Sequence, residues 1–174
     1  MARPVIVPTG VERFFGEDEI IVSKTDPRGV IVYANKIFLD IAGYCEKEVV
    51  GQPHNILRHP GTPSSIFKLM WDRIQAGNEV FAYVCNMAKN GDHYWVLAHI
   101  TPSFSADGAI TGYHSNRRAP ETRILPEIKD LYNRLLTEEE TAGSPKNRIF
   151  AGMNFIDRML GQRGVSYDRF IHSL

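Results

Sequence analysis

The sequence predicts an α+β fold in which one antiparallel sheet carries helices on one face. Two stretches rich in β-branched residues come first, a helical region follows, and three further strand-like stretches complete the pattern. Tight-turn signals join the strands within each group, and strands joined in this way pair antiparallel. With 174 residues, of which 43% are hydrophobic, the chain can build one domain around a substantial core.

Turn residues set the bounds of the expected strands. Asp-Pro-Arg-Gly at 26–29 separates the first two, because proline presets φ and glycine accepts the sharp end of a turn. Asn-Gly at 90–91 and Asp-Gly at 107–108 are hairpin signals between the last three. We therefore expect strands over residues 19–25, 30–33, 80–86, 93–101 and 109–116.

Capping residues and apolar spacing mark the expected helices. Asn35 stands where a helix N-cap is expected, and Gly43 can end that helix. Short helical turns are expected over 46–50 and 54–57. The clearest helix covers 62–76, with Thr62 as its cap and an apolar face at i, i+3, i+4 and i+7, made by Phe67, Met70, Trp71 and Ile74.

The pattern divides the chain into a lead-in (1–18), a domain (19–118) and a helical C-terminal segment (119–174). The last segment holds an apolar stripe spaced four, three and four residues apart, which predicts a helix over 121–136. A second amphipathic helix is expected over 149–160. We expect the first to signal by pairing with a second copy or a partner helix, the alternative being that it folds back on its own sheet. The stripe consists of Ile124, Ile128, Leu131 and Leu135.

Charge and hydropathy exclude several classes of function. The 20 Lys and Arg residues balance 20 Asp and Glu residues, which removes the electrostatic basis for nucleic-acid binding. No apolar run reaches the roughly 18 residues needed to span a bilayer, and the N-terminus lacks the features of a secretory signal. We expect a cytoplasmic protein without direct membrane insertion.

Catalytic and metal-binding motifs are missing from the sequence. It contains no P-loop, no nucleophile elbow and no dinucleotide-binding glycine turn, so we expect no enzymatic activity. Cys45 and Cys85 are isolated, and none of the six histidines forms a paired metal-ligand spacing. A single axial ligand to haem, His54 or His99, stays open as an alternative.

Two longer motifs carry a family resemblance. They are Gly-Gln-Pro-His-Asn-Ile-Leu-Arg-His-Pro at 51–60 and Lys-Asn-Gly-Asp-His-Tyr-Trp-Val at 89–96, supported by Tyr-Ala-Asn at 33–35, Phe38 and Gly-Tyr at 112–113. Over residues 18–120 the chain resembles the PAS domains of bacterial aerotaxis receptors. That family has a five-stranded antiparallel sheet with helices forming a pocket on one face. Its aerotaxis members hold FAD non-covalently and signal through the redox state of the flavin.

The resemblance implies a set of cofactor-binding residues. It assigns Asn35, Arg58, His59, Asn86 and Trp95 to the surroundings of FAD, with Arg58 as the bidentate partner of the pyrophosphate. Trp71 and Phe81 are candidates for its aromatic walls. Each has a simpler interpretation that stays open: Trp71 as core, Asn35 as a plain N-cap and Arg58 as a solvated side chain.

Several positions differ from the relatives. The family usually has Asp where Gly61 stands, and Trp near the place of Phe81. Blue-light-sensing relatives carry a flavin-reactive cysteine in the segment corresponding to 51–54, which here holds none. The alternative function is therefore a PAS module without flavin that mediates dimerisation or docking. In either case we expect a homodimer and a chemotaxis transducer or sensor kinase as partner, since the chain holds no output domain.

Overall fold

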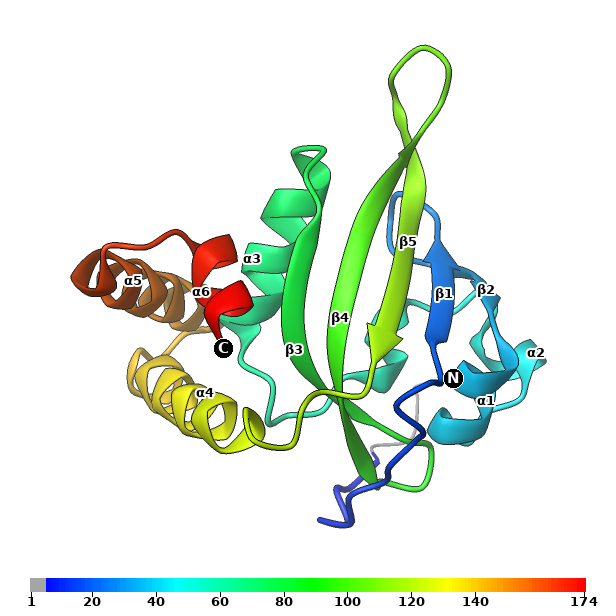
Figure 1. Cartoon of the computed structure of the whole chain (residues 1–174), viewed down its shortest axis with the longest axis horizontal. Coiled ribbons are helices and arrows are strands. Elements are labelled where there is room, and N and C mark those ends of the chain that lie inside the picture. The colour runs from blue at the N-terminus through cyan, green and yellow to red at the C-terminus, as the bar shows by residue number, and fades with distance from the viewer. Residues whose placement is uncertain (1–5) are drawn as a thin grey trace.

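The computed structural model describes residues 6–174 and contains one five-stranded antiparallel sheet (Figure 1). Its strands lie in the order β2-β1-β5-β4-β3, and every neighbouring pair runs antiparallel. This confirms the predicted α+β class. The strands are β1 (Ile21–Thr25), β2 (Ile31–Ala34), β3 (Val80–Met87), β4 (His93–Phe104) and β5 (Ile110–Arg118).

The β3–β4 hairpin turns at the predicted Asn-Gly pair. Gly91 has φ +96°, a conformation that other residues rarely adopt. The turn that it forms brings β3 and β4 together, and they pair from Met87↔His93 to Val80↔Ile100. β4 continues three residues beyond the predicted end at Thr101, because Pro102 still faces Tyr113 in the register with β5. The proline therefore does not stop this strand.

Four helical elements lie between β2 and β3. They are α1 (Lys36–Ala42), α2 (Glu46–Val49), the 3-10 helix η1 (His54–Leu57) and α3 (Ser64–Gln75). The expected cap of α3 was wrong: Pro63 occupies the N-cap position. Thr62 instead bonds the edge of β3, where its hydroxyl donates to the Cys85 carbonyl at 3.0 Å and accepts from the Cys85 N–H at 3.1 Å.

The N-terminal segment lies along the β3–β4 turn. The backbone N–H of Thr9 donates to the Gly91 carbonyl, and that of Arg13 donates to the His93 carbonyl. The Arg13 guanidinium pairs with Asp92 at 2.9 Å. The first five residues of the predicted lead-in lie outside the described part of the chain.

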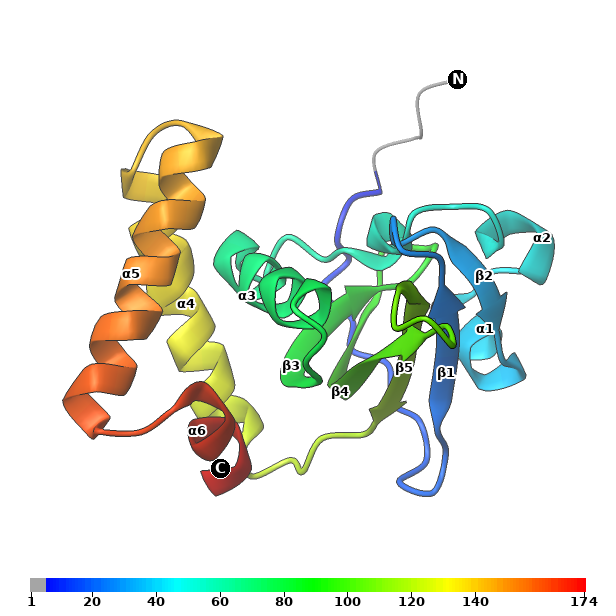
Figure 2. The same cartoon turned by 90° about the horizontal axis from the view of Figure 1, so that it is seen from above.

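The C-terminal segment forms three helices, α4 (Leu125–Thr141), α5 (Pro145–Arg163) and α6 (Tyr167–Ser173). Figure 2 shows α4 and α5 side by side to one side of the molecule, next to α3. The apolar stripe of α4 is buried within this same chain, with Ile128 and Leu135 at most 1% exposed. Of the arrangements considered for the stripe, the structure has the fold-back one.

The C-terminal helices also cover the free edge of the sheet. β3 is an edge strand, and such edges invite pairing with other chains. The Tyr132 hydroxyl of α4 donates to the Tyr83 carbonyl, and the Tyr167 hydroxyl of α6 donates to the Phe81 carbonyl at 2.9 Å. Together with Thr62 at Cys85, these bonds occupy successive outward-facing groups of β3.

A buried carboxylate fastens α4 to α3. Glu139 is 4% exposed, and its two oxygens accept from the backbone N–H groups of Ser64 and Ser65 at 3.0 and 2.7 Å. The Ser65 hydroxyl donates to the same carboxylate at 2.7 Å. Glu139 therefore satisfies the free N–H groups of the first turn of α3 from another helix. No helix among residues 6–174 is long and apolar enough to cross a membrane.

Candidate cofactor pocket

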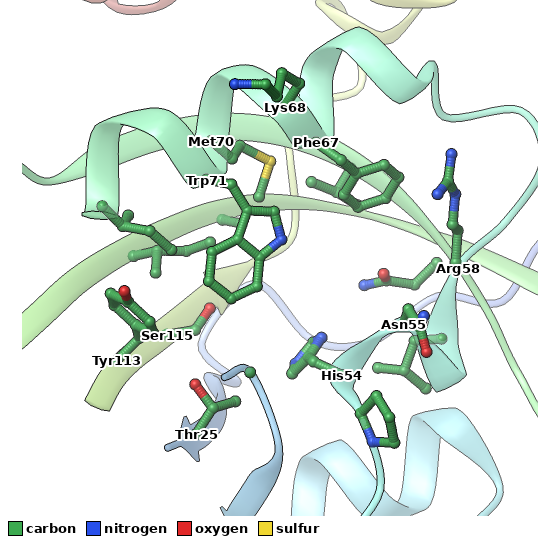
Figure 3. Close-up of a pocket in the computed structure, with 18 of the residues that line it drawn as sticks. Thr25, His54, Asn55, Arg58, Phe67, Lys68, Met70, Trp71, Tyr113 and Ser115 are labelled. Carbon is green, nitrogen blue, oxygen red and sulfur yellow. The ribbon is translucent and has the colours of Figure 1, made fainter. Parts of the chain in front are cut away.

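A cavity of about 640 Å³ lies between α3, η1 and one face of the sheet (Figure 3). This volume is within the range of about 300–1,000 Å³ found for sites that hold cofactor-sized ligands. Strands β1, β3, β4 and β5 supply its floor, and the loop before α3 and the first turns of α5 supply part of its rim. The cavity is therefore built by the domain together with the C-terminal segment.

The walls of the cavity are largely apolar. Phe67, Met70 and Trp71 reach into it from α3, while Val84 and Ala98 line the facing sheet. The indole of Trp71 meets the ring of Tyr113 edge-on, with centroids 5.6 Å apart. The space under Trp71 depends on Gly29, since a Cβ there would lie 2.9 Å from the indole. Such walls suit a flat aromatic ligand.

The inner end of the cavity holds a buried arginine. Arg117 on β5 is 3% exposed, and its Nη2 donates to the Ser23 hydroxyl at 2.7 Å and to His54 Nε2 at 2.6 Å. Burial and the neighbouring guanidinium lower the pKa of His54 to about 3, so the imidazole is neutral at physiological pH. Burial lowers the pKa of Arg117 to about 10, which leaves it charged.

Three buried polar atoms on the cavity floor have no partner among the described residues. They are Nη1 of Arg117, Nδ2 of Asn86 and Oγ of Ser115, each on a residue that is at most 6% exposed. A buried polar group without a hydrogen bond costs free energy, so such groups need an explanation. All three can donate, and the floor therefore suits a ligand that presents hydrogen-bond acceptors.

The charges that line the cavity all have one sign. The lining contains Arg28, Arg58, Lys68, Arg117 and Arg148, and neither Asp nor Glu. Arg28 pairs with Asp26 and Lys68 with Asp72. Within residues 6–174, the other three form no ion pair. An apolar cavity with unpaired guanidinium groups favours an aromatic ligand that carries negative charge.

Three of the seven expected cofactor residues line the cavity: Arg58, Trp71 and Asn86. The Arg58 guanidinium lies over the Phe67 ring, 4.7 Å from its centroid, and donates to the Ser64 hydroxyl at 2.7 Å. Figure 3 shows it at one end of the cavity, beside the start of α3. Asn86 faces the cavity from β3 while its backbone bridges to Arg58.

Asn35 and His59 do not line the cavity. The Asn35 side chain caps α1 by accepting from the Phe38 N–H, accepts from the Val22 N–H, and donates to the Ile20 carbonyl. His59 Nδ1 accepts from the Gly61 N–H at 3.0 Å. A Cβ at Gly61 would lie 2.9 Å from that nitrogen, so the imidazole occupies the space that a larger residue there would need.

Phe81 and Trp95 lie on the face of the sheet opposite the cavity. Side chains alternate between the two faces along a strand. Val84 and Ala98 line the cavity, and each lies three positions along its strand from Phe81 or Trp95, an odd spacing that puts the latter two on the other face. Phe81 stacks on His99, with centroids 4.1 Å apart and an angle of 3°, and meets His172 of α6. Trp95 packs 5.8 Å from Tyr132 of α4. The structure therefore places both residues against the C-terminal helices.

Several lining residues were not singled out from the sequence, namely Ser23, Ser115, Arg117 and Arg148. Tyr113, Ser115 and Arg117 are spaced two residues apart along β5 and all face the cavity. An arginine on the inward face of such a period-two pattern is a signal that could have been used. Arg148 gave no such signal, because it reaches the cavity from α5 only through the docking of that helix on α3.

The haem alternative gains little from the histidine geometry. His99 lies on the opposite face from the cavity and bonds to Glu79 at 2.7 Å. His54 lines the cavity, but its Nε2 accepts from Arg117. Across residues 6–174, no group of three or more His, Cys, Asp or Glu residues is placed to hold a metal ion.

Comparisons with known proteins agree with this architecture. A family model described as the PAS fold matches residues 20–115. The match includes all four helical elements between β2 and β3 and the whole sheet apart from the last residues of β5. The chain belongs to the PAS family. The C-terminal segment with α4, α5 and α6 lies outside the PAS match.

Relatives of this PAS protein include several sensory proteins. It is 36% identical to the aerotaxis receptor of Escherichia coli strain K12 over 79% of this chain and 26% of the receptor. It is 28% identical to a blue-light-activated histidine kinase of Rhizobium johnstonii over 68% of this chain and 35% of the kinase. The chain thus spans about a quarter to a third of these relatives.

Solved structures share the fold of this PAS chain. The light-state structure of the Aureochrome1 LOV photoreceptor matches with a TM-score of 0.56 and 21% identity, over 67% of this chain and 91% of that one. A PAS domain from Colwellia psychrerythraea matches with a TM-score of 0.54 and 22% identity, over 58% and 86%. At these identities the likeness concerns the fold alone.

Proposed function

We propose that this PAS domain is a sensor that binds FAD non-covalently and reports the redox state of the flavin. The observation that carries the proposal is the cavity floor, where Asn86, Ser115 and Arg117 present unpartnered buried donors. The carbonyl and ring-nitrogen edge of a flavin supplies matching acceptors, and the apolar walls suit its rings. The two unpaired arginines at the rim, Arg58 and Arg148, suit its phosphates.

Asn86 is the residue best suited to respond to a change in the flavin. Its amide can donate and accept, so it can exchange hydrogen bonds when a ring nitrogen gains a proton on reduction. Bound FAD supplies the electron-accepting chemistry, while the chain supplies donors, charge and exclusion of water. The relatives named as an aerotaxis receptor and blue-light-activated kinases favour a sensory role.

A redox signal is favoured over a light-driven bond between flavin and cysteine. Neither Cys45 nor Cys85 lines the cavity. Burial raises the pKa of the Cys85 thiol to about 12, so this thiol is not a nucleophile at physiological pH. We propose a non-enzymatic sensor in the cytoplasm that passes its state to a chemotaxis transducer or histidine kinase, with dimerisation as part of that relay.

The test is to identify the released ligand. The protein is expressed with added riboflavin, purified and denatured, and the supernatant is analysed by absorption and mass spectrometry. FAD in near-stoichiometric amount is the expected result, with a flavin spectrum that bleaches on reduction. Haem, or a colourless protein that also fails to take up added FAD, would overturn the proposal and favour a docking module without cofactor.

A further inference from the structure

The rim of the cavity contains residues from outside the PAS match. Pro145, Arg148 and Ile149 of α5 line the cavity, although the family match ends at residue 115. α5 reaches this position as the second helix of the α4–α5 hairpin (125–163), which packs on α3. The helical segment after the domain is thus part of the ligand site.

Close packing fixes the position of α5. A Cβ at Gly152 would lie 2.5 Å from the Ser65 Oγ, so only glycine allows this approach between α5 and the first turn of α3. Arg148 precedes Gly152 by four residues and shares its face of the helix. It therefore lies about one helical turn, about 5.4 Å, from the contact with Ser65.

Arg58 flanks the same turn of α3. Its guanidinium donates to the Ser64 hydroxyl, one residue before Ser65, and also lines the cavity. Two arginines from different parts of the chain thus approach the first turn of α3. Glu139 also binds that turn, accepting from Ser64 and Ser65, and among residues 6–174 it forms no ion pair with either arginine.

Neither arginine at this rim forms an ion pair with a described residue, although the Glu139 carboxylate lies at the same turn of α3. Arg148 is exposed, donates through Nε to the Gly143 carbonyl at 3.0 Å, and forms no ion pair with any residue in 6–174. Arg58 likewise has no acidic partner there. Both arginines line the same cavity, so an anion bound between them would attract both guanidinium groups.

We propose that Arg58 and Arg148 form a phosphate clamp whose second half belongs to the α4–α5 hairpin, so that phosphates of the bound cofactor hold the hairpin against α3. The clamp rests on the proposed function, since it takes FAD as the natural ligand. Its independent support is the pair of unpaired guanidiniums at the rim of a cavity whose floor holds buried donors without partners.

The clamp couples ligand binding to the C-terminal segment. A ligand that contacts α5 only in the docked state must favour that state, and docking must raise ligand affinity by the same factor. The cofactor therefore stabilises the hairpin beyond what Gly152 and Glu139 achieve. Loss or displacement of its phosphates frees the helices that follow the domain, which gives the sensor an output.

The experiment compares three proteins: the wild type, Arg148→Gln, and Lys146→Gln as a control. Lys146 lies on α5 two residues away, is exposed and does not line the cavity, so it matches the charge change without the contact. Affinities for FAD, FMN and riboflavin are measured by fluorescence titration of apo-protein. Hydrogen exchange of residues 145–163 is followed with and without each flavin, and with inorganic pyrophosphate.

The expected result is selective. Arg148→Gln weakens FAD binding about tenfold, as for loss of a charged hydrogen bond, while Lys146→Gln changes it less than about twofold. Riboflavin, which has no phosphate, binds all three proteins alike. FAD slows exchange in α5 of the wild type and not of Arg148→Gln. Melting of the three apo-proteins shows whether each is folded, and Arg148→Lys is expected to recover part of the affinity.

The outcomes separate the clamp from the proposed function. If flavins bind the wild type and Arg148→Gln equally, and exchange in α5 ignores the ligand, the clamp is wrong while the flavin proposal stands. If no flavin binds, the proposed function is wrong, and the effect of pyrophosphate on hydrogen exchange in α5 then tests the clamp. Slower exchange in the wild type alone then supports the clamp, and equal exchange in both proteins overturns it.

Discussion

His54 and Arg117 show how burial sets the chemistry of single residues here. Both are basic and share a hydrogen bond, yet only the arginine keeps its charge, because an imidazole gives up its proton far more easily than a guanidinium. The neutral His54 can therefore accept from Arg117 Nη2. This leaves Arg117 Nη1 as a buried, charged donor without a partner in the described chain.

The lowered pKa of the His54 imidazole makes the stability of the fold depend on pH. Its pKa is about 3 in the folded protein and about 6.5 in the unfolded chain, so the unfolded chain binds a proton first as the pH falls. The stabilisation is complete above pH 6.5 and is lost between pH 6.5 and pH 3. Between pH 7.5 and 5.5 the loss is about 1 kcal/mol. Urea unfolding of the apo-protein at both values measures it.

His54→Gln is the matched variant for this prediction, because an amide oxygen can still accept from Arg117 and does not titrate. The pKa values of His59 and His114 are also lowered, and both residues remain in the variant. The wild type should therefore lose about 1 kcal/mol more than the variant over this range. Equal losses would mean that His54 is protonated in the folded protein.

At the residue scale, the sequence could supply candidates but not the face of the sheet on which they lie. Arg58 and Asn86 were identified by motif, and they do line the cavity. Phe81 and Trp95 were equally plausible as aromatic walls, but a change of one residue in strand phase moves a side chain to the opposite face. The register of Cys85 with Trp95 puts these two on one face, and the lining of the cavity by Val84 and Asn86 shows that it is the face turned away from the cavity.

Among the elements, α5 depends on its two internal glycines in opposite ways. Gly152 touches Ser65, whereas a Cβ at Gly161 would meet nothing within 4 Å. Gly152→Ala should destabilise the fold by about 1–3 kcal/mol, the usual cost of overpacking. Gly161→Ala should stabilise it by up to about 1 kcal/mol through helix propensity. Urea midpoints of the two variants measure the contrast.

The pair also tests the docking of the hairpin. Both changes add the same methyl group to the same helix, so propensity alone would move both midpoints upward. A gain in stability for Gly152→Ala would show that α5 does not approach α3 as closely as the structure has it. Faster proteolysis within residues 119–174 of Gly152→Ala, but not of Gly161→Ala, is the accompanying expectation.

Element type was predictable wherever periodicity and turn chemistry agreed, and element ends were less so. All five strands and α3 were found within a few residues. α4 begins at Leu125 rather than 121, because Pro126 suits the first turn of a helix and the residues before it form turns. α6 was missed, since its seven residues carry too short a pattern and its Ser166 cap gains meaning only once Phe170 packs.

For the whole molecule, the C-terminal helices act as a cover for the sheet. They satisfy carbonyl groups on the outer edge of β3 and bury Trp95, Tyr83 and Cys85. A chain that ends at Arg118 would expose this edge and an apolar face together. We expect it to self-associate at micromolar concentration, because uncovered edge strands pair with one another. Light scattering of the shortened and full-length chains at equal concentrations measures this.

A lysine on the exposed edge provides the control for the shortened chain. Tyr83→Lys places a charge on β3, which disfavours pairing between edges. It should reduce self-association of the shortened chain if the edge is the cause. If the shortened chain stays monomeric and has the same melting temperature as the full-length protein, then α4, α5 and α6 neither protect the edge of the sheet nor stabilise it.

β3 has a cavity on one side and helices on the other. Asn86 and Val84 point to the cavity, while Tyr83 and Cys85 lie on the side where α4 and α6 pack. Only the strand β3 therefore separates a ligand on the cavity floor from the C-terminal helices at this point. A displacement of Asn86 would act on the C-terminal helices over a short distance. Peptide groups of the same strand bond the hydroxyls of Thr62, just before α3, and of Tyr132 on α4.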